Sequence, residues 1–133
     1  MIVSADEFLR LRYSDDPDEY SRAAQEPATL DVWLEIVRQH PDSRIWVARN
    51  KTVPNEILLI LVGDENPEVR FAVAMKRKLA PELLDRLAND SDESIRLQVA
   101  RHGNTSRQIL ERLVGDRWAA VANAAAERLG RES

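Results

Sequence analysis

The sequence predicts an all-α fold of about five short helix pairs that repeat with a period of about 26 residues. The segment from Asp64 to Asp90 contains an acidic turn, a helix, a basic turn and a second helix, and it matches the following chain when shifted by one period. A fixed period of roughly 20–50 residues is typical of repeat proteins. Only four glycines interrupt stretches rich in helix-forming residues. The aligned positions are Leu61/Leu87/Leu113, Asp64/Asp90/Asp116, Val69/Ile95/Val121, Val73/Val99/Ala125 and Ala74/Ala100/Ala126.

Residues 1–26 are predicted to form a degenerate first unit. A helix is expected from Ser4 to Arg12, because Ser4 and Glu7 have the spacing of a capping box. A second helix is expected to begin at Pro17, a residue suited to a first helical turn. Its buried face would carry Tyr20, Ala23 and Ala24.

Residues 27–129 are predicted to form the regular units, with 130–133 as a tail. Apolar residues at helical spacing mark each helix. Trp33 is expected in the core, and a second helix is expected from Arg44 to Arg49. Gly63 is expected to stop a helix, and the last helix is expected to run from Trp118 to Leu129 with Gly130 as its cap. The apolar sets are Leu30, Trp33, Leu34 and Val37; Ile45, Val47 and Ala48; Ile57, Leu58 and Leu61; Val69, Phe71, Val73 and Ala74; Leu83, Leu84 and Leu87; Ile95, Leu97, Val99 and Ala100; and Ile109, Leu110 and Leu113.

Stacking is required because neither helix of a unit can bury its apolar face alone. Each pair would pack on the next, so that residues 1–133 form one repeat domain with a continuous core. Alanine recurs at positions 48, 74, 100 and 126, where a small side chain lets neighbouring second helices approach closely.

The composition excludes several classes of function. The chain has no cysteine, so it has no disulfide framework, thiolate metal site or cysteine nucleophile. No apolar run approaches the roughly 20 residues of a membrane span, and the first residues lack the features of a signal peptide, so we expect a cytoplasmic protein without a membrane partner. The net charge of −4 disfavours general attraction to nucleic acid.

The pattern Asp-x-x-x-x-Val/Ile-Arg, found at Asp64 to Arg70 and at Asp90 to Arg96, resembles HEAT-like repeats. The short period and the segments VARNKTVP and VARHGNTS are more similar to the leucine-rich repeat variant branch. The resemblance implies a right-handed α-α superhelix (an α-solenoid) that serves as a binding scaffold. It also implies that Asp64, Arg70, Asp90 and Arg96 form a structural ladder between units. Two end units depart from the pattern, with Arg38 at an Asp position and Ala122 at an Arg position.

Charge alternates between the two kinds of turn. Turns within a helix pair are acidic and turns between pairs are basic, the latter including Lys76 and Arg101. Capping of helix ends explains most of this pattern, since acids favour helix starts and bases favour helix ends. A basic edge that meets phosphate or an acidic protein is the alternative. Some bacterial DNA glycosylases are built from HEAT-like repeats, but they are longer and more basic.

A partner-binding surface is expected on the second helices. Position 46 and its equivalents vary between constant neighbours, as Trp46, Ala72, Gln98 and Ala124, and are expected to face solvent on the side that the resemblance makes concave. Tryptophan is common at binding hot spots, although Trp46 could instead pack against the first unit. The sequence predicts a non-enzymatic scaffold for an unknown protein or peptide; the residues expected to bind it are Trp46, Arg49, Lys76, Gln98 and Arg101.

Catalytic and cofactor signals are weak. The two histidines, His40 and His102, have no partners at metal-ligand spacing, and no glycine-rich phosphate loop is present. The acidic run from Asp15 to Glu19 lacks the glycine of a calcium loop. We therefore expect no catalytic residue, no cofactor and no metal.

Overall fold

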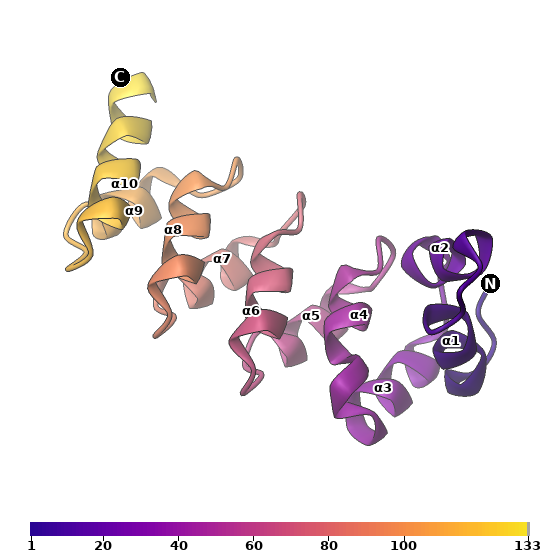
Figure 1. Ribbon diagram of the computed structural model, residues 1–133. Helices are drawn as coiled ribbons and strands as arrows, with labels where there is room; N and C mark the ends of the chain where they lie inside the picture. Colours follow the sequence, from indigo (N-terminus) through magenta and orange to yellow (C-terminus); the bar gives the residue numbers. More distant parts are fainter. Residues whose placement is uncertain (133) are drawn as a thin grey trace. The chain divides into compact units, whose positions relative to one another are not determined.

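The protein is all-helical in the computed structural model, which describes residues 1–132 (Figure 1). These residues form ten α-helices, one short 3₁₀ helix and no strand; their only β contact is an isolated bridge between Ile2 and Ala28. The all-α prediction is thus confirmed. The helices are α1 (Ala5–Arg12), α2 (Pro17–Gln25), α3 (Leu30–Gln39), η1 (Pro41–Ser43), α4 (Arg44–Arg49), α5 (Asn55–Leu61), α6 (Pro67–Ala74), α7 (Pro81–Ala88), α8 (Glu93–Arg101), α9 (Arg107–Leu113) and α10 (Ala119–Glu132).

The described chain divides into two compact units. The first unit, Met1–Asp64, contains α1 to α5, and the second begins at Glu65 and contains α6 to α10. Each unit is described by itself.

The first unit is built around α3, which packs against α1, η1, α4 and α5. Trp33 of α3 is fully buried, and its ring meets that of Phe8 edge-on, with centroids 5.4 Å apart and planes at 80°. This geometry is favourable for aromatic pairs. The prediction that Trp33 lies in the core is confirmed.

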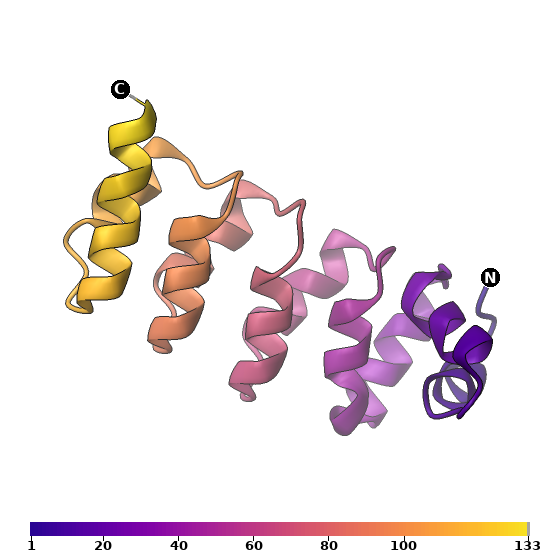
Figure 2. The same ribbon diagram turned by 45° about the horizontal axis from the view of Figure 1, so that its top comes forward.

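The second unit contains two rows of helices (Figure 2). Helices α6, α8 and α10 contact one another in series, and α7 contacts α9. Leucine and isoleucine side chains of α7, α8 and α9 are fully buried, including Leu83, Leu87, Ile95 and Leu110. Burial of a side chain of this kind contributes roughly 1.5–3 kcal/mol, so these helices are stabilised by one another.

Two helix-boundary predictions need correction at the end of the chain. Helix α10 begins at Ala119 rather than Trp118, and it continues through Gly130 to Glu132. No described glycine has a positive φ, so Gly130 does not form a left-handed cap. The ion pair between Glu127 and Arg131, one turn apart, supports the helix across the glycine.

The expected burial of two side chains also needs correction. Tyr20 is 40% exposed, because α2 buries only Ala23 fully and the longer tyrosine side chain extends to the surface. Ala126 is exposed, although its equivalents Ala48, Ala74 and Ala100 are buried. Ala126 therefore lies on a face of α10 that the contacts with α8 and α9 leave uncovered.

Substitution of these alanines tests whether burial demands a small side chain. We expect Ala100→Leu to lower the free energy of unfolding by about 1–3 kcal/mol, because the fully buried site has no room for the added carbons. The same change at Ala126, one period away, is expected to cost at most about 0.5 kcal/mol, because that site is exposed. Urea unfolding followed by circular dichroism measures both. Equal losses for the two variants would contradict this account of the repeated alanine.

Candidate functional site

Three arginine–aspartate pairs join one turn to the next within the two units. Each pair spans 20 residues: Arg44 with Asp64 at 3.1 Å, Arg70 with Asp90 at 2.8 Å, and Arg96 with Asp116 at 2.8 Å. The pairs in the second unit are bidentate, with second contacts of 3.2 and 3.3 Å. Arg44 makes only one carboxylate contact because its Nε donates to the Val37 carbonyl. The four residues of the implied ladder thus lie in buried or half-buried ion pairs.

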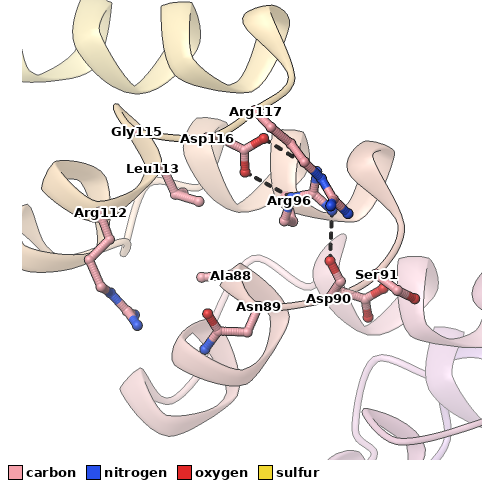
Figure 3. Close-up of a pocket in the computed structure, with 10 residues that line it drawn as sticks. All are labelled: Ala88, Asn89, Asp90, Ser91, Arg96, Arg112, Leu113, Gly115, Asp116 and Arg117. Atoms are coloured by element: carbon pink, nitrogen blue, oxygen red, sulfur yellow. Dashed lines mark hydrogen bonds and ion pairs between the residues drawn. The ribbon is translucent and has the colours of Figure 1, made fainter.

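The Arg96–Asp116 pair lines a cavity of about 420 Å³ in the second unit (Figure 3). The hydrogen bonds from Arg96 lower the pKa of Asp116 and raise that of Arg96. Arg96 also donates to the Asp90 carbonyl at 2.8 Å, and Arg112 is paired with Asp85 at 2.5 Å. Two of the three arginines at this cavity are therefore already bound to acceptors of the chain itself, and we assign it a structural role.

A second set of contacts was not foreseen from the sequence. Asn50, His102 and Arg128 occupy equivalent positions in the 26-residue period, and each bonds to main-chain carbonyls of an earlier helix end. His102 Nδ1 accepts from the Asn104 amide at 3.0 Å, so Nε2 carries the proton and donates to the Lys76 carbonyl at 2.7 Å. The sequence did contain a signal for these contacts, because a polar residue recurs at this position of the period, just after the second helix or within it. His102 is therefore a buried structural residue.

The candidate binding site is a mostly apolar cavity of about 410 Å³ in the first unit. Helices α1, α2 and α4 form it, and two arginines and two aromatic side chains contribute to its wall, but no acidic residue does. Trp46 is half-buried, so part of its surface can meet a ligand. The lining residues are Arg12, Tyr20, Ala23, Ala24, Trp46 and Arg49.

Both arginines are held against the Trp46 ring. The guanidinium carbon of Arg12 lies 3.4 Å from the ring centroid, and that of Arg49 lies 5.1 Å from it. These are cation–π distances. Arg12 Nε is buried and has no hydrogen-bond partner among the described residues. Neither arginine has an acidic partner in the part of the chain that the structure describes, unlike Arg10, which is paired with Glu19 at 2.5 Å.

The structure brings together Trp46 and Arg49, the two predicted binding residues of the first unit. Lys76, Gln98 and Arg101 belong to the second unit, where Arg101 lines a separate cavity of about 400 Å³ with residues of α10. Gln98 is half-buried. Lys76 is also half-buried, and burial lowers its pKa to about 8.

The expectation that position 46 and its equivalents face solvent is wrong at Ala72, which is 6% exposed. Trp46, Gln98 and Ala124 are half-buried. The position therefore lies at the border of the contact between helices, and its exposure differs from one helix to the next. Arg12 and Tyr20 were missed as site residues. They come from residues 1–26, the degenerate repeat, where comparison with the other repeats does not indicate which side chains face the site.

Among residues 1–132, no group of three or more histidine or acidic side chains is placed to hold a metal ion. No described helix combines the length and apolar character needed to cross a membrane. Comparisons with models of known protein families, with curated proteins and with solved structures found no match.

Proposed function

We propose that the protein is a non-enzymatic scaffold of the α-solenoid type, a right-handed stack of helix pairs, whose second helices bind a protein or peptide segment. One observation carries the proposal: the cavity beside Trp46 is mostly apolar, open to a ligand and lined by two cations that have no acidic partner in the described part of the chain. The serial contacts of α6, α8 and α10, together with the repeated arginine–aspartate pairs, support the solenoid arrangement.

The dimensions of the cavity favour an inserted side chain of a protein segment. Ligand cavities measure about 300–1,000 Å³ and have mostly apolar walls with a few polar groups that fix orientation. The Trp46 cavity, at about 410 Å³, lies at the lower end of this range. Tryptophan, tyrosine and arginine are also the residues that dominate binding energy at protein interfaces.

The alternative is nucleic-acid binding along the turns that follow the second helices. Its support is a set of exposed cations there, Arg77, Lys78 and Arg101. Two observations weigh against it: the net charge is −4, and Arg12 covers one face of the ring on which a base would stack. If phosphates were bound, affinity for DNA or RNA would fall steeply as salt is raised.

Selection from a random dodecapeptide library tests the proposal. We expect the protein to enrich a set of related peptides and Trp46→Ala to lose that enrichment, because the side chain forms part of the cavity wall. Trp118→Ala is the matched control, since Trp118 is 40% exposed in the other unit. Circular dichroism of each variant confirms that it folds. Absence of any Trp46-dependent peptide would contradict the proposal.

A further inference from the structure

We propose that the Trp46 cavity recognises an acidic segment of a partner protein, in which an aspartate or glutamate side chain flanks an apolar side chain. The inference rests on the proposed function and names the chemistry of its ligand. The apolar side chain enters between Tyr20, Ala23 and Trp46, and the flanking carboxylate binds Arg12 and Arg49.

The first argument is the uncommitted hydrogen-bonding capacity of the two arginines. A guanidinium that lies over an aromatic ring keeps its N–H donors in its own plane, available to a planar acceptor. Arg12 lies 3.4 Å from the Trp46 centroid, and its Nε has no acceptor among residues 1–132. No other donor of Arg12 is bound to an acidic residue of the described chain either, so its guanidinium is available to a carboxylate of a ligand.

The second argument is the local balance of charge. The cavity is lined by two cations and by no anion. Glu19 of α2 and Glu26, which follows the helix, are already paired with Arg10 and Arg22, each at 2.5 Å. The other acidic residue of α2, Asp18, is exposed in its first turn and does not line the cavity. The lining of the cavity therefore carries positive charge although the chain as a whole carries a charge of −4.

Capping alone does not account for this arrangement. Arg12 and Arg49 are the last residues of α1 and α4, where the helix dipole favours a cation. That effect explains an arginine at each helix end, but it does not require both guanidinium groups to lie on one tryptophan beside an apolar cavity. Charge complementarity thus favours an acidic occupant over a neutral or basic one.

The experiment compares three dodecapeptides that are blocked at both ends and carry a central phenylalanine flanked by glutamates, glutamines or lysines. Blocking restricts the available carboxylates to side chains. Isothermal titration calorimetry is expected to show the glutamate peptide binding most tightly and the lysine peptide most weakly. Arg12→Gln and Arg49→Gln are each expected to weaken the glutamate peptide about tenfold or more, the size of a lost hydrogen bond to a charged group. Arg38→Gln is the control, because Arg38 is an exposed arginine of the same unit that does not line the cavity.

The outcomes separate this inference from the proposed function. The inference is overturned if the glutamate and glutamine peptides bind with equal affinity. It is also overturned if the peptides selected through Trp46 are not enriched in acidic residues. Either result leaves peptide binding in place. Tight Trp46-dependent binding of a single-stranded oligonucleotide in place of the peptides overturns both.

Arg12→Lys keeps the charge but lacks the planar fork, and it is expected to bind the glutamate peptide more weakly than the unaltered protein.

Discussion

We expect Trp33→Ala to lower the free energy of unfolding by about 3–5 kcal/mol, the usual cost of truncating a large buried aromatic side chain. Trp33 is fully buried in the first unit and packs edge-on against Phe8. Removing its ring leaves a cavity between α1 and α3 that the short helices have little means to fill. Since small domains are stable by only about 5–15 kcal/mol, this loss is a large fraction of the total and should clearly lower the melting temperature. Urea unfolding with circular dichroism detection gives the value.

Two further variants at tryptophan positions make this prediction specific. Trp33→Phe keeps a buried ring and removes an indole N–H that has no hydrogen-bond partner among the described residues, so its cost should be much smaller. Trp118→Ala truncates a tryptophan that is 40% exposed, and it should also cost less. A loss for Trp33→Ala no larger than that for Trp118→Ala would contradict the placement of Trp33 in the core of the first unit.

The second large effect is expected for Arg96→Ala, which should lower the free energy of unfolding by about 3 kcal/mol, as when one partner of a buried ion pair is removed. The variant leaves the Asp116 carboxylate and the Asp90 carbonyl without their guanidinium donor. Arg112→Ala is the matched control, because its pair with Asp85 is about half exposed and should contribute less than about 1 kcal/mol. Thermal and urea unfolding of the two variants should differ clearly. Similar losses would show that the Arg96 pair has no special structural role.

The same pair predicts a dependence of stability on pH. Arg96 lowers the pKa of Asp116 below its usual 3.8 in the folded chain. The folded state therefore binds the Asp116 proton less readily than the unfolded state does, so the stabilisation is complete above the unfolded value and is lost as pH falls through the folded pKa. Asp116→Asn should lower the melting temperature near neutral pH. As the pH is lowered, the melting temperature of this variant should then fall less than that of the unaltered protein. An unchanged acid profile in Asp116→Asn would contradict this role.

The sequence predicted the fold class and most helices because the physical cause of both is local. Apolar residues at helical spacing, such as Leu83, Leu84 and Leu87, have to face a common core, and the structure buries all three. Boundaries that depend on side-chain contacts were less predictable. Gly130 was expected to end the last helix, but it keeps a helical backbone with no positive φ, and the helix continues to Glu132.

The candidate site was predictable only in part. Trp46 and Arg49 could be selected because one stands at a variable position of the repeat and the other at a basic helix end. Arg12 and Tyr20 could not, because their place beside Trp46 depends on how α1 and α2 pack near α4. Exposure at position 72 was also mispredicted, since an alanine there is small enough to be covered completely by its neighbours. Ala124, an alanine at the same position of the last helix, is half-buried, so the neighbours of each helix decide which equivalents of Trp46 reach the surface.

Nuclear magnetic resonance of the three indole N–H groups tests the binding site most directly, because the chain has only three tryptophans. The probe is the most enriched dodecapeptide from the library selection, added stepwise to protein labelled with nitrogen-15. We predict that the Trp46 signal shifts with peptide concentration, while the signals of Trp33, which is buried, and Trp118, which belongs to the other unit, stay in place. A bound peptide that leaves the Trp46 signal unchanged and shifts that of Trp118 would show that the protein binds its partners elsewhere.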